Sequence, residues 1–351
     1  MRCASDQDRS RRAFLRQAAT ATAAAALTPQ TDSAMTHARE IFPHVYEIRS
    51  TFGDRYLQQY LFVGDTVVLL DAGVASTPET TIFPYLEKVG LNPAKIDIVI
   101  AMHADADHHG GLPAIKNASR NTLLACHQRD LKLIEEPERL YQDRYNFLAR
   151  DHQLGFGREG MVNCPEGRRV DLVLAAGETI QIGPEWKLHV WHVPGHSDGH
   201  LAIYDEKHKA AFTSDAVQAN GYPTVDGKMA FGPTYYTVDA YLSTIHFLEQ
   251  QPIEHIFSGH WKAQHGEEVR NFLAQSRGFV EKADELIKIY FRDRQKATLR
   301  QLIEAVSPKL GPWPAETAPF LQFAIYGHVT RLEQSGFLQH SKTSPVEYFR
   351  P

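Results

Sequence analysis

Residues 103–111 read His-Ala-Asp-Ala-Asp-His-His-Gly-Gly and follow directly on the apolar run 96–102. This run is short and rich in β-branched residues, a pattern typical of a buried strand. A loop at a strand end can direct alternate side chains toward one point. The spacing therefore predicts that His103 and Asp105 share one metal ion, and that Asp107 and His108 reach a second ion beside it.

Further residues of metal-ligand type follow three later strand-like segments: His196, Asp215 and His260. Gly195 stands before His196 and lets the backbone turn so that the imidazole points back toward the sheet. Strand ends are where α/β sheets place their sites. One such residue alone would be a turn or core residue, but a series of imidazoles and carboxylates predicts a metal centre.

Strands and helices alternate over residues 40–270, which predicts an α/β layered domain. Strand patterns occur at 60–63, 66–70, 122–126, 187–193, 200–204, 210–213 and 255–257, and helical patterns at 80–90, 111–117, 129–136 and 238–250. Residues 141–169 are irregular and rich in charged and aromatic side chains, which indicates a lid or an insertion.

Residues 275–351 have the outline of a small, mainly helical winged-helix-like domain. Apolar spacing predicts helices at 279–291, 299–306 and 319–336, and the segments 337–340 and 346–349 could pair as a hairpin. Residues 281–351 hold ten Lys and Arg against eight Asp and Glu. This weak balance favours a structural cap or an active-site wall over a nucleic-acid-binding domain.

The first 34 residues have the order of a bacterial twin-arginine signal. Residues 10–16 read Ser-Arg-Arg-Ala-Phe-Leu-Arg and precede a weakly apolar, Ala-rich run and a short polar stretch. We therefore expect the twin-arginine export machinery to carry the folded protein to the periplasm or beyond. Translation from Met35 would instead leave the product in the cytoplasm.

Composition excludes some partners. The net charge of −5 and the pI near 6.4 give no electrostatic reason to expect nucleic acid or an anionic membrane as a partner, and no apolar run is long enough to span a bilayer. A small-molecule substrate is expected, and the oligomeric state stays open. Beyond Cys3, only Cys126 and Cys164 remain; they could form one disulfide, but we interpret both as structural.

The whole motif set resembles the metallo-β-lactamase superfamily, over roughly residues 42–265. The resemblance rests on the His-x-Asp-x-Asp-His motif and on His196, Asp215 and His260. Asp71, within Leu-Leu-Asp-Ala-Gly at 69–73, resembles the superfamily's first motif, a buried carboxylate behind the metal loop. The resemblance implies an αββα sandwich with a dinuclear metal site. The C-terminal helices resemble the winged-helix cap of some single-chain members.

The resemblance also implies a role for each ligand candidate. The first metal would be held by His103, Asp105 and His196, the second by Asp107, His108 and His260, and Asp215 would bridge both. A hydroxide between the ions would be the nucleophile, and Asp107 would also act catalytically by passing a proton to the leaving group. His109, His200 and His265 are interpreted as supporting or substrate-contacting residues, or equally as plain structure.

Asp105 departs from the usual pattern, because most of the superfamily has His at this position. Two divalent ions bring four positive charges, and Asp105, Asp107, Asp215 and a hydroxide bring four negative ones. A neutral cluster should be a weaker Lewis acid, and an added oxygen ligand favours iron or manganese. Zinc is the metal that the resemblance implies, with iron or manganese as the alternatives that Asp105 admits.

The leading functional hypothesis is hydrolysis of an ester, thioester, lactone or similar bond in a small molecule. A di-iron oxidoreductase acting on a small oxidant is the alternative, and a metal-holding binding protein without turnover is a third. An antibiotic-degrading lactamase is disfavoured, and no basic groove indicates a nuclease. Pocket-wall candidates are Tyr222, Tyr235, Tyr236 and the aromatic stretch 141–156.

The N-terminal pattern generates a test of export. If Arg11 and Arg12 form the recognition pair, the double variant Arg11→Lys/Arg12→Lys should stay in the cytoplasm with its N-terminus intact. Cell fractionation and N-terminal sequencing measure this. Unchanged periplasmic fractionation of the double variant would contradict the signal.

Overall fold

The computed structural model describes residues 37–293 and 296–351. The expected signal at residues 1–34, with Cys3 and the alternative start Met35, lies outside the described residues. Within the described ranges, no helix is both long and apolar enough to cross a bilayer.

Seven strands form the first sheet, and they lie side by side in chain order. They are β1 (His37–Phe42), β2 (Val45–Phe52), β3 (Arg55–Val63), β4 (Val67–Leu70), β5 (Ile98–Ile100), β6 (Leu123–His127) and β7 (Leu172–Leu174). β1 to β4 pair antiparallel, whereas β4 to β7 pair parallel. The hairpin predicted between 60–63 and 66–70 is therefore confirmed as β3 and β4.

Six strands form the second sheet, in the order β15-β14-β11-β10-β9-β8. Their bounds are β8 (Thr179–Gly183), β9 (Trp186–His192), β10 (Leu201–Asp205), β11 (Ala210–Ser214), β14 (His255–Ser258) and β15 (Gln264–His265). A short hairpin, β12 (Tyr222–Pro223) with β13 (Met229–Phe231), stands apart from both sheets. All four strands predicted for this part of the chain are present.

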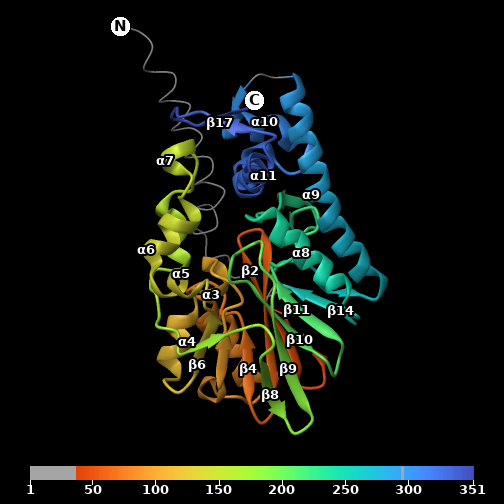
Figure 1. The fold of residues 1–351 in the computed structure, drawn as a ribbon. Helices are drawn as coiled ribbons and strands as arrows, with labels where there is room; N and C mark the ends of the chain where they lie inside the picture. Colours follow the sequence, from red (N-terminus) through yellow and green to blue (C-terminus); the bar gives the residue numbers. More distant parts are fainter. Residues whose placement is uncertain (1–36, 294–295) are drawn as a thin grey trace.

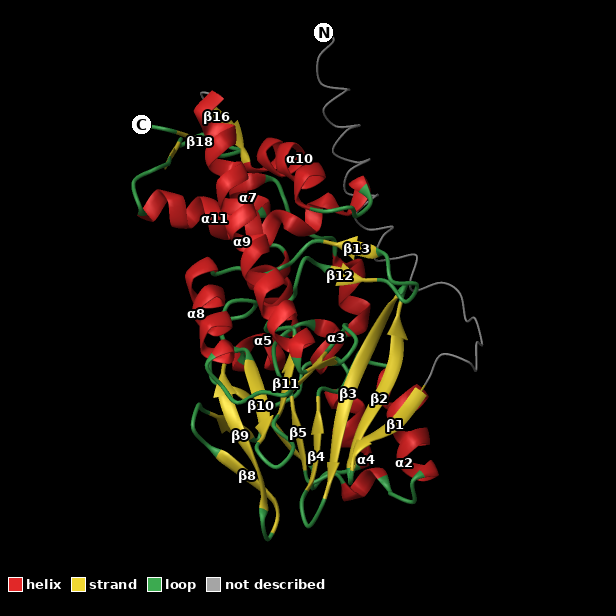
Figure 2. Ribbon diagram, turned by 90° about the vertical axis from the view of Figure 1, so that its right-hand side faces the viewer, coloured by secondary structure: helices red, strands yellow, loops and turns green. Residues whose placement is uncertain are grey.

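The two sheets face each other, and helices cover their outer faces (Figure 1, Figure 2). Along β3 the side chains alternate between the two sides, as the pleat of a strand requires. Tyr60 and Phe62 join the core between the sheets, with Phe212 and Phe257 of the second sheet. Leu61 points the other way, into the core beneath the helices. The arrangement confirms the α/β layers that the sequence pattern predicts and the αββα sandwich that the resemblance implies.

The helices of the sandwich include the four predicted segments and two further short helices, at 93–95 and 106–109, that the sequence pattern did not indicate. They are η1 (Pro78–Ile82), α2 (Phe83–Lys88), η2 (Pro93–Lys95), α3 (Ala106–His109), α4 (Leu112–Ala118), α5 (Leu131–Glu135) and α8 (Val238–Glu249). The helix expected at 80–90 divides into η1 and α2.

Residues 141–169, which we call the insert, extend from the sandwich to the C-terminal helices (Figure 1), and Tyr145, Met161 and Cys164 pack in the core on the helix side of the first sheet. The insert is less irregular than expected because short helical turns run into and through it. These are α6 (Pro137–Arg139), η3 (Leu140–Tyr145), α7 (Ala149–His152) and η4 (Arg158–Asn163).

The C-terminal unit contains three helices and a small sheet, in the order that the sequence predicts. Its elements are α9 (Glu267–Asp293), β16 (Lys296–Thr298), α10 (Leu299–Leu310), η5 (Ala315–Leu321), α11 (Gln322–Gln334), β17 (Gln339–His340) and β18 (Glu347–Phe349). The expected hairpin is β17 with β18, and β16 adds a third strand that the sequence pattern did not indicate.

α9 begins twelve residues before the predicted start at Phe279 and runs through the expected domain boundary near 270–275. Its apolar face explains this continuity. Phe272 and Leu273 pack in the same cluster as Ile245 of α8, and further along the helix Ala283 and Ile287 belong to that cluster with α10 and α11. One buried core therefore joins the sandwich to the C-terminal unit.

Candidate metal centre

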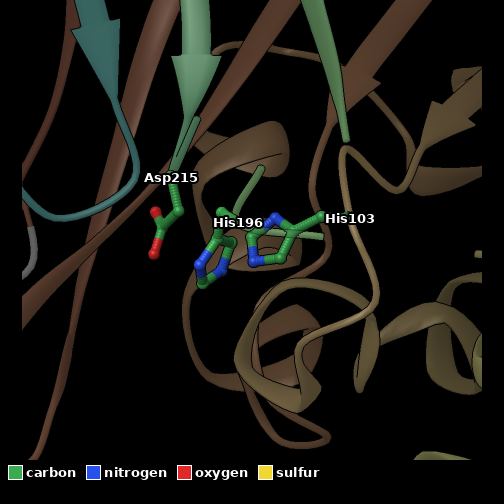
Figure 3. Close-up of side chains that lie close together, drawn as sticks. All are labelled: His103, His196 and Asp215. Carbon is green, nitrogen blue, oxygen red and sulfur yellow. The ribbon is translucent and has the colours of Figure 1, made fainter. Parts of the chain in front are cut away.

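The predicted ligands stand at one edge of the sandwich, each at or just after the end of a strand. They are His103 after β5, Asp107 and His108 in α3, His196 between β9 and β10, Asp215 after β11, and His260 after β14. His103, His196 and Asp215 point toward a common space although they come from three separate strands (Figure 3). Gly195 has a φ of 137°, which gives the turn expected before His196.

The ligand atoms fall into two groups. One atom from each of His103, His196 and Asp215 lies within 4.8 Å of the others, and the same holds for Asp107, His108 and His260. The sequence analysis assigned these residues to two metals in the same division, with Asp215 shared. The structure thus brings together six of the seven predicted ligands as two candidate cation sites.

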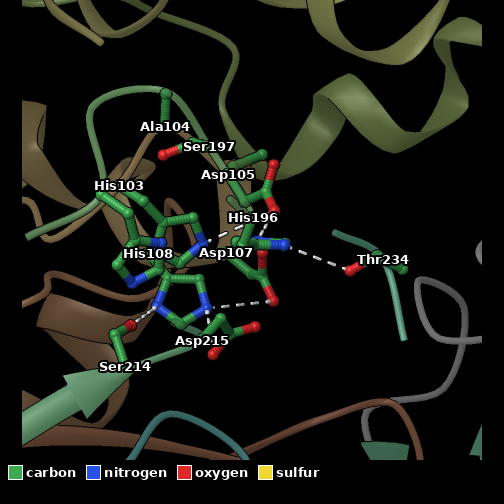
Figure 4. Close-up of polar contacts among 12 residues, drawn as sticks. His103, Ala104, Asp105, Asp107, His108, His196, Ser197, Ser214, Asp215 and Thr234 are labelled. Atoms are coloured by element: carbon green, nitrogen blue, oxygen red, sulfur yellow. Dashed lines mark hydrogen bonds and ion pairs between the residues drawn. The ribbon is translucent and has the colours of Figure 1, made fainter. Parts of the chain in front are cut away.

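Asp215 lies between the two groups. Its Oδ1 is 3.7 Å from Nε2 of His108, and its Oδ2 is 3.5 Å from Nε2 of His260. Asp107 contributes an oxygen 3.4 Å from Nε2 of His260. Figure 4 shows the side chains of Asp107, His108 and Asp215 close together. Atoms at these separations can share one metal ion. Asp215 lies where its carboxylate could bind an ion in each of the two groups.

Unsatisfied polar atoms show that the site fits a cation. Neither ring nitrogen of His103, which is fully buried, has a hydrogen-bond partner among the described residues, and Oδ1 of Asp215 also lacks one. Nε2 of His108 and Nε2 of His260 lie 3.2 Å apart. Such groups are costly to bury unless something else binds them. Gly259 keeps the space open, because a Cβ there would lie 2.6 Å from Asp215 Oδ1.

Asp71 fixes the orientation of His108. Its Oδ2 lies 2.8 Å from Nδ1 of His108 and accepts a hydrogen bond from Oγ of Ser214, while Oδ1 accepts from the backbone N–H of Met102. With Nδ1 facing Asp71, Nε2 of His108 faces the site. The carboxylate predicted behind the metal loop therefore links β4, β5 and β11. The backbone carbonyl of Tyr56 orients His260 in the same way, through Nδ1 at 2.7 Å.

The site is strongly negative. Burial lowers the pKa of His108, but the charges of Asp215, Asp71 and Asp107 outweigh it and raise that pKa to about 10. Burial raises the pKa of Asp107, yet the neighbouring His108 and His260 bring it down to about 2. Carboxylates that stay ionised in a buried space attract cations.

Asp130 joins the two loops that carry the first group, a link that the sequence analysis missed. Its carboxylate accepts hydrogen bonds from the backbone N–H of Ala104, from Oγ of Ser197 and from the backbone N–H of Gly199. Ala104 follows His103, and Ser197 follows His196. Asp130 therefore holds these two imidazoles in register. It precedes α5, and although His127 lies three residues before it, this segment stands outside the motifs that identify the ligands.

Asp105 has two different neighbours. Its Oδ2 lies 2.8 Å from Nε2 of His196 and 3.5 Å from Nε2 of His103, so this oxygen faces the first group. The whole carboxylate also pairs with Arg144 of the insert through Nε and Nη2. The side chain of Arg144 is only 5% exposed. Burial raises the pKa of Asp105, but the charge and hydrogen bonds of Arg144 hold it well below its usual range.

Other predicted residues fall outside the ligand groups. His200 stacks on His103 with ring centres 4.5 Å apart and its Nε2 lies 3.1 Å from the carbonyl of Thr213, so it supports the site. His109 is buried beside Cys164. His265 is exposed on β15 and pairs with His255. Cys126 and Cys164 are free and buried, so they form no disulfide and are structural.

A cavity of about 140 Å³ opens onto the metal centre. Tyr222 and Tyr236 line it, as predicted. Tyr222 donates from its hydroxyl to Oδ2 of Asp215 at 2.8 Å, so it also steadies the candidate bridging ligand. The prediction for Tyr235 is wrong: this residue is fully buried and bonds to His328, because adjacent residues in an extended segment point to opposite sides.

Comparison with known proteins identifies the family. A sequence model of the metallo-beta-lactamase superfamily matches residues 54–260. The chain belongs to this superfamily. A metallo-beta-lactamase family protein from Thermus thermophilus has the same fold, with a TM-score of 0.69 at 18% identity over 89% of this chain and 100% of that one. A beta-lactamase domain protein from Burkholderia ambifaria gives 0.71 at 17% identity over 92% and 96%.

Two curated proteins are similar to part of the chain. The chain is 25% identical to the acyl-coenzyme A thioesterase MBLAC2 of Gallus gallus over 214 residues, which are 56% of this chain and 68% of the relative. It is 29% identical to the transcription termination factor FttA of Methanothermobacter thermautotrophicus over 164 residues, 44% of this chain but only 24% of that protein. The two relatives have different named activities, so these similarities do not fix one activity for this chain.

Arg144 changes the charge count expected for this superfamily member. With Asp105 alone, the cluster of two divalent ions, three carboxylates and a hydroxide is neutral. The guanidinium adds one positive charge next to Asp105, so the pair is neutral and the cluster has the net charge expected with His at that position. The net charge therefore gives no reason to expect a weaker Lewis acid here. The oxygen ligand of Asp105 still favours iron or manganese over zinc.

The pair generates a test on metal content and stability. Asp105→His alone should bind less metal and unfold more easily, by about 3–5 kcal/mol, because it leaves the buried Arg144 without its counter-charge. The double variant Asp105→His/Arg144→Met should regain much of the metal content and much of the stability. Mass spectrometry of bound metal and urea unfolding measure the two quantities. The matched control is Arg158→Met, an exposed insert arginine that pairs with Glu138, and it should change neither. Equal behaviour of the single and double variants would show that the pair is not coupled.

Proposed function

We propose that this chain is a dinuclear, metal-dependent hydrolase that cleaves a thioester or a related ester or lactone bond in a small molecule. The observation that carries the proposal is the position of the two ligand groups at the inner end of a cavity lined mainly by apolar side chains. Such a cavity suits a substrate with an apolar part next to a polar, cleavable bond.

Two divalent ions would be held by His103, Asp105, His196 and Asp215, and by Asp107, His108, His260 and Asp215. Bound there, they would supply Lewis-acid chemistry and lower the pKa of a water molecule toward neutrality. We propose zinc, because Arg144 restores the charge of the usual site; iron and manganese remain the alternatives that the oxygen ligand admits.

The chain's own residues position the reaction. Asp107 is 19% exposed and lines the cavity, so its carboxylate can carry a proton to the leaving group. Tyr222 holds Asp215 in place through its hydroxyl. Asp71 and Asp130 fix the loops behind the ligands, which keeps the ligand atoms in a constant geometry. The similarity to an acyl-coenzyme A thioesterase supports a thioester as the bond to test first.

Export through the twin-arginine machinery stays part of the proposal. This route carries folded proteins, so the metals would be loaded before the chain leaves the cytoplasm. Its support is the sequence of residues 10–16 alone.

Metal analysis together with thioester hydrolysis tests the function. The purified protein should hold two ions per chain and release thiol from acetyl-coenzyme A or a longer acyl thioester. A chelator should abolish turnover, and zinc should restore it. Asp215→Ala should lower metal content and reduce kcat/KM more than about a hundredfold, since it removes a ligand shared by both sites. The control Asp226→Ala removes an exposed carboxylate of β-hairpin 222–231 and should change neither.

Different failures have different meanings. Iron with oxygen consumption and no hydrolysis of thioesters, esters or lactones would favour the oxidoreductase alternative. Retained metal with no turnover of any kind would favour a binding protein. A wild-type protein that holds one ion under saturating supply would contradict dinuclearity.

A further inference from the structure

An unbroken series of aromatic rings lines the cavity beside the metal centre. Phe156 of the insert lies 4.9 Å from Phe320 of η5, measured between ring centres, and Phe320 stacks on Phe231 of β13 at 4.3 Å. Phe231 stacks in turn on Tyr222 at 4.5 Å. All four side chains line the cavity. Three segments far apart in sequence thus supply one wall.

The wall is continuous with the reacting end of the site. Tyr222 donates to Asp215, so the series ends at a candidate metal ligand. On the other side Phe323 of α11 stacks on Tyr236, with ring centres 4.6 Å apart, and Tyr236 lies under the guanidinium of Arg144. A substrate whose cleavable bond lies at Asp215 would therefore place its acyl group against Phe231, Phe320 and Phe323.

Simple packing between two units would not leave this space. The rings of a packed interface interdigitate and exclude voids larger than a water molecule. Here Phe320 and Phe323 of the C-terminal unit face a cavity of about 140 Å³ instead of filling it. That volume is close to the roughly 150 Å³ of an apolar protein cavity that binds benzene.

Two cationic side chains, Arg55 and Arg144, line the cavity. Arg55 lines it, with its guanidinium 4.9 Å from the ring centre of Phe231 and 5.4 Å from that of Phe52. Arg55 already pairs with Asp54 at 2.8 Å. Arg144 is likewise paired, with Asp105. Because both cations have counter-charges, the wall favours an uncharged acyl group.

We propose that the C-terminal unit completes an acyl pocket, and that the preferred substrate carries an uncharged, apolar acyl group about the size of a hexanoyl or benzoyl group. Phe320 and Phe323 set this preference. The inference rests on the proposed hydrolase function and adds the substrate class. It also gives the C-terminal unit a role in specificity.

A series of thioesters with one leaving group tests the pocket. With N-acetylcysteamine thioesters, kcat/KM should rise about fourfold per methylene from acetyl to hexanoyl, because each buried methylene adds that much binding. Benzoyl should match hexanoyl, and palmitoyl should fall below it because the chain exceeds the cavity. Glutaryl should be poorer than hexanoyl. Equal rates across the series, or glutaryl as the best substrate, would overturn the inference and leave the hydrolase intact.

Variants locate the preference. Phe320→Ala and Phe323→Ala should each lower the hexanoyl-to-acetyl ratio of kcat/KM by roughly tenfold, and Phe320→Leu should lower it less. The matched control is Phe337→Ala, a phenylalanine of the same unit that packs on its core without lining the cavity. It should leave the ratio unchanged. A ratio that falls equally in all variants would show a general loss of packing and would contradict the proposal.

A binding measurement separates this inference from the proposed activity. Calorimetry should show that hexanoate binds the wild-type protein more tightly than acetate, and that Phe320→Ala loses most of the difference. This result stands even if no thioester is cleaved, in which case the hydrolase proposal fails and the pocket remains. Equal binding of acetate and hexanoate to the wild-type protein would overturn the pocket whether or not thioesters are hydrolysed.

Discussion

Five carboxylates converge at one edge of the sandwich, and the structure depends on the hydrogen-bond donors and cations that balance their charges. A buried carboxylate needs hydrogen-bond donors or a cation, since burial without them costs several kcal/mol. Asp130 and Asp71 accept hydrogen bonds from backbone N–H groups and hydroxyls, and Asp71 also pairs with His108. The guanidinium of Arg144 balances the charge of Asp105. Asp107 and Asp215 lie beside the imidazole of His260. Oδ1 of Asp215 has no hydrogen-bond partner among the described residues. The pattern separates carboxylates that build the scaffold from those left for metal ions.

The fold and the ligands could be predicted because both follow local patterns. β-branched runs mark the strands, and His103, His196, Asp215 and His260 stand where those runs end. The edge strands β1, β7 and β8 were missed because their apolar patterns are short: β7 has three residues, and in the five residues of β8 only Ile180 and Ile182 alternate. The domain boundary near 270–275 stays a prediction, and α9 runs through that region with one apolar core continuing along it.

Residues that act on the site from a distance could not be predicted. Arg144 reaches Asp105 across 39 positions of sequence, from a segment with no periodic pattern, and Asp130 connects two loops that lie far from it in the chain. Tyr222 was expected on the pocket wall for its aromatic character alone, and its bond to Asp215 came from the fold. Tertiary contacts of this kind decide which ordinary Arg, Asp or Tyr belongs to a site, and a single sequence holds no record of them.

The insert connects the metal centre to the C-terminal unit through its own contacts. At one end, the side chain of Arg144 pairs with Asp105, and the backbone carbonyl of Arg144 accepts a hydrogen bond from the hydroxyl of Tyr236. Further along, the carbonyl of Asp151 accepts from the backbone N–H of Val346, between β17 and β18, and Phe156 packs on Phe320. The insert therefore carries both the counter-charge of Asp105 and one ring of the aromatic wall, so a single short segment joins the first ligand group to the C-terminal unit.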